Sequence, residues 1–277
     1  SKDPHYIYMS NYLLDCIYLW GDTMLFIRIM LLLAALSMTC TAFASQPKEI
    51  KQTNITSNQF AISWITDTPG TAAILYGPGT NSINLLAVDD RSSTTHHIEV
   101  LSGLYQNTTY YYDIISGGIT YNNAGQHYSL TTGTGMRSGS DQVYGQVYKA
   151  DGHTASDGTI VYLRINNLDG KGSVGSSSEL STTVVGSNGS WFIELINART
   201  SDLSGFFDYS LSGDSLSIFV QGGIDGTGRL ITNIATDSPC QSIIISTDTT
   251  APAKITNLSV GTVGQTSVIL TWSSPGD

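Results

Sequence analysis

The sequence predicts an all-β protein made of tandem antiparallel β-sandwiches, with an N-terminal signal-peptide helix and a truncated C-terminal sandwich. Short apolar stretches with period-2 alternation are separated by turns rich in Gly, Pro and Asn. One sequence pattern occurs twice, at Asn54–Gly70 and Leu258–Asp277. In each copy an alternating strand ends in a tryptophan, Trp64 or Trp272, which is followed by a Pro-Gly pair. A repeat of this kind indicates a modular chain.

The composition is typical of a turn-rich extracellular β protein and argues against a nucleic-acid partner. Charged residues make up 12% of the chain and the net charge is −10, whereas soluble domains usually carry roughly 25% charged residues. An acidic surface repels a phosphate backbone, and no Lys/Arg cluster reverses the sign locally. We therefore expect no nucleic-acid binding.

The first 44 residues are expected to lie outside the folded modules. In residues 24–44 a basic Arg28, an apolar run and then Ala42-Phe43-Ala44 follow the order of a secretory signal peptide, with cleavage expected after Ala44. The alternative is an uncleaved membrane anchor, but polar residues interrupt the run before the ~20 apolar positions that a span needs. Residues 1–23 are expected to be an upstream extension and not a domain. The sequence thus predicts a secreted or cell-surface protein with no membrane span after cleavage.

One cysteine, Cys240, remains after the predicted cleavage. A single cysteine cannot form an internal disulfide, so an exported chain of this kind must be stabilised by core burial alone. We expect Cys240 to be a buried thiol.

Residues 47–133 are predicted to form a seven-stranded antiparallel sandwich. Alternation along the predicted strands places Trp64, Tyr110 and Tyr112 in the core and leaves Tyr111 outside. Leu104 precedes Tyr110 by six positions, which is the arrangement of a tyrosine corner, where the phenol hydroxyl bonds to upstream backbone.

This module resembles the fibronectin type III family in Trp64, in Leu104 with Tyr110, and in the closing Tyr128–Thr132 strand. It also resembles the variant found ahead of purple acid phosphatases, and the stretches that carry this likeness are Ile74–Gly77, His97–Val100, Gly103-Leu104 and Thr109–Tyr112. The resemblance implies a non-catalytic companion module, because the metal-binding motifs of that family lie in a separate catalytic domain.

Residues 134–140 read as a flexible Gly/Ser-rich linker to a second β module at 141–247. Asp151-Gly152 and Ser187–Ser190 are strong turn signals between its strands. The order Val-x-Gly-x-Val from Val143, then Asp-Gly, then Gly-Ser-Trp-Phe resembles the carboxypeptidase-regulatory-like, transthyretin-like sandwich. That resemblance also implies a module that is usually non-catalytic.

Residues 248–277 begin with a stiff Asp-Thr-Thr-Ala-Pro phrase and supply the first two strands of a second, truncated fibronectin type III-like module. Two strands cannot cover each other's inner face, and an isolated hairpin is marginal in water. We expect Leu270 and Trp272 to be poorly buried.

Several short patterns suggest chemistry but are better explained as structure. Gly213-Asp214-Ser215-Leu216 spells the motif of GDSL-type esterases, yet no histidine follows an Asp by three positions, so a turn before a strand is the stronger interpretation. Neighbouring His96 and His97 on a strand point to opposite faces and cannot share a metal ion. Loop carboxylates lack the spacing of a calcium loop; they are Asp89, Asp90, Asp151, Asp157, Asp169 and Asp225.

We therefore predict no catalytic, cofactor-binding or metal-ligating residue, and no cofactor. Tyr111 is the one exposed aromatic of its strand that could face a carbohydrate or a protein. Four asparagines, Asn54, Asn107, Asn188 and Asn257, fit the Asn-x-Ser/Thr glycosylation pattern.

Two functions remain open from the sequence. The first is a non-catalytic secreted or cell-surface protein that acts as spacer, scaffold or adhesion module, with a protein or carbohydrate partner at the cell surface. The alternative is that these modules are the N-terminal accessories of an extracellular phosphatase, peptidase or glycosidase whose catalytic domain lies beyond residue 277.

Overall fold

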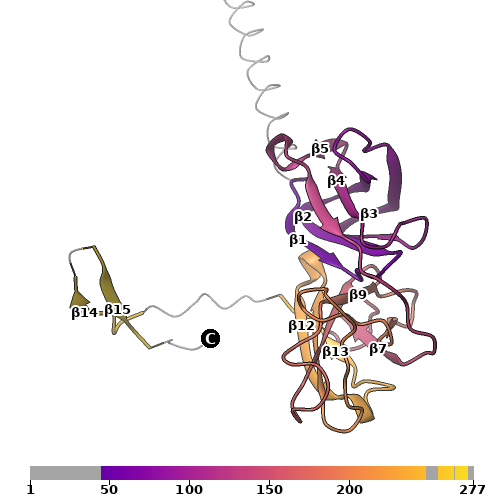
Figure 1. Cartoon of the computed structure of the whole chain (residues 1–277). Helices are drawn as coiled ribbons and strands as arrows, with labels where there is room; N and C mark the ends of the chain where they lie inside the picture. The colour runs from indigo at the N-terminus through magenta and orange to yellow at the C-terminus, as the bar shows by residue number, and fades with distance from the viewer. Residues whose placement is uncertain (1–44, 248–254, 265, 274–277) are drawn as a thin grey trace, which may run out of the picture.

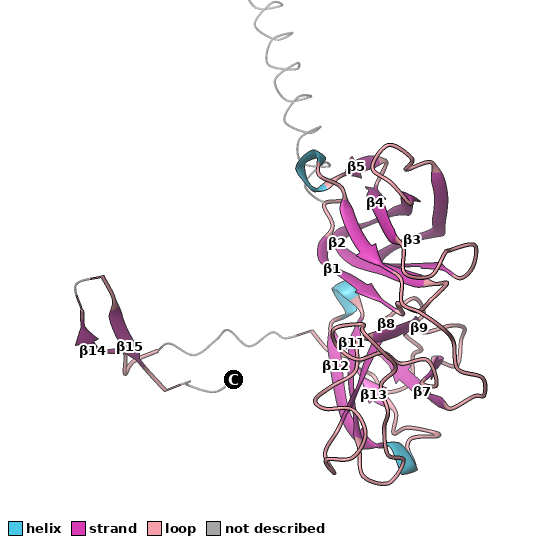
Figure 2. Cartoon of the chain, in the orientation of Figure 1, coloured by secondary structure: helices cyan, strands magenta, loops and turns pink. Residues whose placement is uncertain are grey.

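The computed structural model describes residues 45–247, 255–264 and 266–273, and its regular structure is β throughout apart from short 3₁₀ turns (Figures 1 and 2). The predicted signal peptide at 24–44 and the upstream residues 1–23 lie outside the described residues. Among the described residues, no helix has the length and apolarity needed to cross a membrane. The all-β prediction is confirmed.

The first module has six strands in one hydrogen-bonded network, one fewer than the seven that the sequence predicts. Its elements are β1 (Lys48–Thr53), β2 (Phe60–Gly77), β3 (Leu85–Val100), β4 (Thr109–Ser116), β5 (Ile119–Tyr121), the turn η2 (Asn123–Gly125) and β6 (Tyr128–Thr131). All strand pairs are antiparallel, with β2 beside β1, β3 and β4, and β4 beside β5 and β6.

Strand β2 is longer than its local sequence pattern suggests. Pro69-Gly70 is a turn signal between the alternating residues 60–64 and 74–76, but both stretches belong to β2. The register between β2 and β3 shifts on either side of Gly70, so Pro69, which has no N–H to donate, lies where the ladder is interrupted. As a result β2 pairs through its first half with β1 and through its second half with β4.

The core of the first module gathers side chains from both halves of β2. Trp64, Tyr112 and Ile74 are fully buried, and the indole Nε1 of Trp64 donates to Ser116 Oγ at 3.3 Å. The predicted burial of Trp64, Tyr110 and Tyr112 is confirmed, and Tyr111 is half-buried.

The tyrosine corner is also confirmed. The backbone N–H of Tyr105 donates to the hydroxyl of Tyr110 at 2.9 Å, while Leu104 is buried beside it. The loop is therefore attached to the core by a phenol whose ring is itself buried.

The second module has a three-stranded and a four-stranded sheet around one core. Its elements are β7 (Gln142–Tyr148), β8 (Ile160–Asn166), β9 (Leu180–Thr183), β10 (Ser190–Glu194), β11 (Ser215–Gln221), η3 (Gly223–Asp225), β12 (Thr227–Asn233), η4 (Ile234–Thr236) and β13 (Ile243–Ile244). The sheet orders are β10-β7-β13 and β12-β11-β8-β9, and only the short β13–β7 pair is parallel among the described pairs.

The core between these sheets contains Trp191, Phe207 and Cys240. Cys240 is the buried free thiol that the sequence predicts, its Sγ–H donates to Asp237 O at 3.1 Å, and burial raises its pKa to about 12. Strand β12 was not predicted, because its residues alternate only between exposed and half-buried positions and leave no clear apolar face.

The segment 134–140 is held in place, whereas its composition predicts a flexible linker. The guanidinium of Arg199, which is 1% exposed, donates to the carbonyl oxygens of Thr134 and Gly135 at 2.7 and 2.8 Å. The backbone N–H of Arg137 donates to Asn197 Oδ1 at 2.8 Å. A buried cation that uses linker carbonyls as its acceptors fixes the backbone that supplies them.

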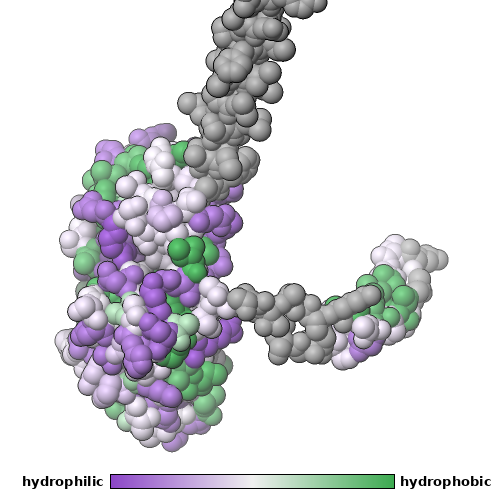
Figure 3. Space-filling view, turned by 180° about the vertical axis from the view of Figure 1, so that it is seen from behind, coloured by the Kyte–Doolittle hydropathy of each residue, from purple (hydrophilic) through white to green (hydrophobic). Residues whose placement is uncertain are grey.

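The last described strands, β14 (Ser259–Val263) and β15 (Val268–Thr271), form an antiparallel hairpin. Leu270 and Trp272 are 46% and 55% exposed, as predicted. Figure 3 shows apolar residues gathered on this hairpin. Trp272 therefore differs from Trp64, which has the equivalent place in the repeated pattern and is fully buried.

Candidate functional site

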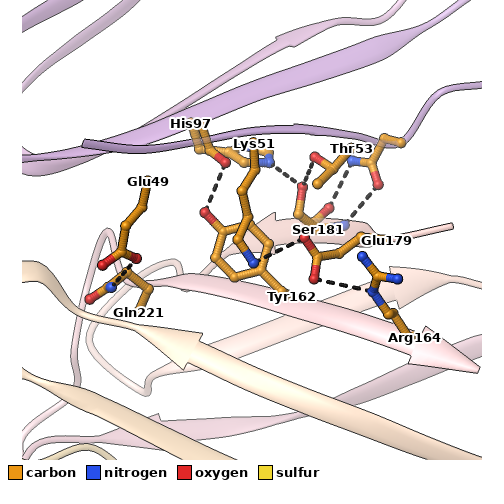
Figure 4. A network of polar contacts seen from close by, with 11 residues as sticks. Glu49, Lys51, Thr53, His97, Tyr162, Arg164, Glu179, Ser181 and Gln221 are labelled. Atoms are coloured by element: carbon orange, nitrogen blue, oxygen red, sulfur yellow. Dashed lines mark hydrogen bonds and ion pairs between the residues drawn. The ribbon is translucent and has the colours of Figure 1, made fainter. Parts of the chain in front are cut away.

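The two modules meet in a polar junction, where side chains of both form a network of hydrogen bonds and ion pairs (Figure 4). We define the junction as the contacts of Thr53, Asn54, Ser63, Thr95 and His97 in the first module with Gly158, Tyr162, Glu179 and Ser181 in the second. The first set comes from β1, β2, β3 and the residue after β1. In the second set Tyr162 lies in β8 and Ser181 in β9, while Gly158 and Glu179 lie just before these strands.

The side-chain amide of Asn54 bonds the edge of β9 in the way that the backbone of a neighbouring strand would. Its side-chain Nδ2 donates to Ser181 O, and its Oδ1 accepts from Ser181 N–H, both at 2.8 Å. The backbone N–H of Asn54 also donates to Glu179 O at 3.2 Å. Asn54 has a φ of 53°, a left-handed conformation that asparagine tolerates better than most residues.

The hydroxyl of Ser181 is shared by two residues of the first module. Its Oγ lies 2.5 Å from Thr53 Oγ1 and 2.7 Å from His97 Nε2. Burial lowers the pKa of His97 to about 4. The charge of Arg91 lowers this pKa further, and the charge of Asp89 raises it by less. The neutral imidazole is therefore the form that the junction holds at pH 7.

A second buried bond joins Ser63 of β2 to Tyr162 of β8, with their hydroxyl oxygens 2.8 Å apart. Tyr162 is 2% exposed, and burial raises the pKa of its phenol. Thr95 adds a hydrogen bond from its Oγ1 to Gly158 O at 2.8 Å. Because buried polar groups are costly when unpaired, these contacts specify one relative placement of the two modules.

A charged rim borders the junction. Glu179 accepts from Lys51 Nζ at 3.0 Å and from Arg164 Nε at 3.4 Å, and Lys51 Nζ also lies 4.0 Å above the ring of Tyr162. Gln221 Nε2 donates to Glu49 Oε2 at 2.9 Å. These ion pairs are partly accessible to solvent, with the Glu179 side chain 16% exposed, and such pairs contribute less than the buried hydrogen bonds of the junction.

Beside this rim lies a groove of about 680 Å³ on the outer face of the four-stranded sheet. The residues of that face that line it are Tyr162, Arg164, Ser217, Phe219, Arg229 and Ile231, with Glu49 and Lys51 contributed by β1. The strand pairing puts Arg229, Phe219 and Tyr162 in one row across β12, β11 and β8.

The residues of the motifs that suggested chemistry do not come together in one site. Ser215 opens β11 opposite Asn166 and Asn233, and none of the hydrogen bonds described for it reaches a histidine. Its neighbour Asp214 is fully buried and accepts from the N–H groups of Leu168 and Ser210 at 3.0 and 2.8 Å, as a turn carboxylate would.

His96 and His97 point to opposite faces, as predicted. His96 is fully buried with its ring 5.2 Å from that of Trp64, and burial lowers its pKa to about 4, while His97 belongs to the junction. In the described part of the chain, no three His, Cys, Asp or Glu side chains gather as they would around a metal ion.

The carboxylates that were expected in loops make local contacts, although Asp89 and Asp90 lie within β3 and not in a loop. Asp89 pairs with Arg91 at 2.8 Å; burial would raise its pKa, but hydrogen bonds from Arg91 lower it overall. Asp225 pairs with Lys149 at 2.8 Å. Asp151 accepts from the N–H groups of His153 and Thr154 at 2.9 and 2.8 Å, and Asp157 accepts from Gly186 N–H at 3.2 Å.

The four glycosylation patterns differ in their surroundings. Asn107 and Asn188 are exposed on loops, and Asn257 is exposed beside the C-terminal hairpin. The amide of Asn54 is instead occupied at the junction. A glycan on Asn54 is therefore incompatible with this arrangement of the modules.

The sequence reasoning did not identify the junction or the groove. The junction depends on pairing between Asn54 and Ser181, 127 residues apart, and no local pattern reports such a pair. The groove gives a weak signal, since Tyr162 and Phe219 occupy the outward positions of predicted strands, where a polar residue is usual.

No family model matches the chain, and no curated protein matches it. Among solved structures, the chain is similar to the FN1–FN3 domains of chicken CNTN1, with 11% identity over 82% of this chain and 74% of that chain and a TM-score of 0.23. It is also similar to a two-domain fibronectin type III segment of chicken tenascin, with 13% identity over 68% of this chain and 98% of that chain and a TM-score of 0.24.

Proposed function

We propose that this chain is a non-catalytic, exported modular protein that serves as a spacer, scaffold or adhesion module outside the cell or at its surface. In this proposal residues 47–133 form a fibronectin type III-like sandwich, residues 141–247 a carboxypeptidase-regulatory-like sandwich, and residues 248–277 the start of another module. The export signal that the sequence predicts at 24–44 supports the location.

The observation that carries the proposal is the junction. A spacer or scaffold has to hold its ends at a fixed separation and orientation, whereas modules that are joined only by a linker rotate freely. Here the buried hydroxyls of Thr53, Ser63 and Ser181 are all bonded across the boundary. Arg199 holds the linker as well, so both connections between the modules oppose rotation.

The proposal excludes catalysis by this chain. A serine nucleophile needs a base within hydrogen-bond reach, and Ser215 makes no contact with a histidine among the described hydrogen bonds. The buried histidines are held neutral in structural positions, His96 against Trp64 and His97 at the junction. These features favour a structural role.

Two assays test the proposal. The purified chain, incubated with p-nitrophenyl phosphate, p-nitrophenyl acetate and chromogenic glycosides, should release no product above the buffer rate. Turnover that disappears in Ser215→Ala would contradict the proposal. In a secreting host, the chain should be recovered outside the cell with Ser45 as its first residue, and retention of the intact chain in the cytoplasm would contradict the proposed location.

A further inference from the structure

A row of side chains leads from the junction to the free edge of the second module. Phe219 lies opposite Tyr162 on one side and opposite Arg229 on the other. The two rings are 6.1 Å apart and nearly parallel, at 16°. The guanidinium of Arg229 lies 5.3 Å from the centre of the Phe219 ring. Exposure increases along the row, from buried Tyr162 through half-buried Phe219 to exposed Arg229.

Arg229 is unusual among the cations of this acidic chain. Nine lysines and arginines lie in the described residues. Seven of them pair with a carboxylate within 4.0 Å, and Arg199 donates to two carbonyl oxygens. Within that same set only Arg229 has no oxygen partner, and its described contact is the face of Phe219. Its five N–H donors are therefore available to a ligand.

The edge of β12 next to Arg229 also has unpaired backbone groups. Thr227 uses both its N–H and its carbonyl on that edge, in two bonds of 3.0 and 3.1 Å with Ser246. Because alternate residues of an antiparallel strand direct their backbone groups to the same side, those of Arg229 and Ile231 also point away from β11. No described hydrogen bond reaches them there. The side chain of Ile231 is 76% exposed.

We propose that the edge of β12 binds an extended peptide segment of a partner protein as an added antiparallel or parallel strand, with a carboxylate of the segment on Arg229 and an apolar side chain on Ile231. Added strands gain affinity from backbone hydrogen bonds and specificity from alternate side chains. Arg229 and Ile231 are two residues apart and share the groove face, so the segment needs an acidic residue and an apolar residue in the same i, i+2 relation. This inference goes beyond the proposed spacer role.

Charge complementarity argues for this occupant over a second copy of the same edge. Residues 227–233 contain no Asp or Glu, so self-pairing of β12 would leave Arg229 without a carboxylate. Carboxylate–guanidinium pairs are bidentate and directional, and they are strongest where an apolar neighbour excludes water. Phe219 beneath Arg229 and Ile231 beside it provide that setting.

A charge-swap titration tests the proposal. The probes are two blocked, fluorescein-labelled peptides, Thr-Val-Thr-Glu-Thr-Val-Thr and the same peptide with Lys in place of Glu; valine on both sides of the charge makes either strand direction usable. The full chain should bind the Glu peptide, measured by fluorescence anisotropy, and Arg229→Glu should weaken it at least about tenfold while it gains binding to the Lys peptide. Lys171→Glu makes the same charge change in a loop, on a lysine whose side chain is 81% exposed, and should leave both affinities unchanged.

A second variant tests the backbone part. Ile231→Pro removes the N–H that faces away from β11, a change that an edge strand tolerates, and it should abolish binding of the Glu peptide with an unchanged circular dichroism spectrum. The proposal is overturned if the wild-type chain binds neither peptide, or if Arg229→Glu and wild type prefer the same peptide. It is also overturned if the chain self-associates in sedimentation and Ile231→Pro restores the monomer, since the occupant would then be a second copy.

Discussion

The side-chain amide of Asn54 makes two hydrogen bonds, each of 2.8 Å, with the backbone of Ser181 in the other module. The amide thereby substitutes for one residue of a neighbouring strand at the edge of β9. Ser181 completes the contact with its hydroxyl, which lies within hydrogen-bond distance of both Thr53 and His97. One residue of the second module is thus bonded to three of the first, and this relationship explains why the two modules have a defined orientation.

Replacing Asn54 with alanine should weaken the junction. The change leaves the N–H and carbonyl of Ser181 without partners at a buried position, which costs about 2 kcal/mol. Chemical unfolding of the full chain measures this loss. Asn107→Ala is the matched control, because Asn107 shares the left-handed backbone, with a φ of 51°, but its side chain makes no described bond across the boundary. Equal losses in the two variants would show that only the backbone conformation matters.

The two tryptophans of the repeated pattern should respond oppositely to truncation. Trp64→Ala empties a fully buried site and should destabilise the first module by ~3–5 kcal/mol. Trp272→Ala removes a side chain that is 55% exposed and should leave the unfolding midpoint of the two modules unchanged. Denaturant titration followed by far-UV circular dichroism distinguishes the two results. A near-neutral Trp64→Ala would contradict the core described here.

The tyrosine corner predicts a smaller effect. Tyr110→Phe keeps the buried ring but removes the acceptor of the Tyr105 N–H, so we expect a loss of about 1 kcal/mol. Tyr111→Phe, one position along β4 and half-buried, is the matched control and should change stability by less. Urea unfolding of both variants in the full chain gives the comparison. A larger loss from Tyr111→Phe would contradict the assignment of the corner.

Acidification should destabilise the folded chain. Burial lowers the pKa of His96 and His97 from 6.5 to about 4, so the unfolded chain takes up protons below about pH 6.5 while the native state does not. Stability is therefore complete above that pH and falls as the pH decreases to about 4, by a few kcal/mol at most for each histidine. Buried Asp237, whose pKa is raised to about 6, acts in the opposite direction between about pH 4 and 6.

Unfolding free energies at pH 7 and pH 5 measure this dependence. His97→Gln should reduce the difference between the two values, because it removes one of the groups that titrate on unfolding. His153→Gln alters an exposed histidine in a turn and should leave the difference as in wild type. A wild-type chain that is equally stable at both pH values would contradict the buried, neutral state of the two histidines.

The strands and the core were predictable because they follow local alternation. Trp64 and Tyr110 occupy inward positions of apolar strands, and Leu104 at a spacing of six identified the tyrosine corner. Pro69-Gly70 misled the prediction, because a proline at a register shift looks the same in sequence as one in a turn. Strand β12 was not predicted, because it is an edge strand with half-buried positions and its residues show almost no alternation in hydropathy.

The junction could not be predicted from the sequence. Its bonds join small polar residues that are common on any β surface, and their importance arises only from the distant residue opposite them, as for Ser63 with Tyr162. The linker illustrates the same limit. Its composition is that of a flexible segment, but Arg199, more than sixty residues away, binds its carbonyl oxygens at Thr134 and Gly135.

The most direct test of the fixed junction is the distance distribution between spin labels on the two modules. Nitroxides can be attached through p-acetylphenylalanine at Thr80 and Ser187, which are exposed on the first and second modules, so that no cysteine is modified. Double electron–electron resonance on the full chain should give a single narrow distance distribution. A broad or multimodal distribution in the wild-type chain would contradict the claim that the junction holds the modules in one arrangement.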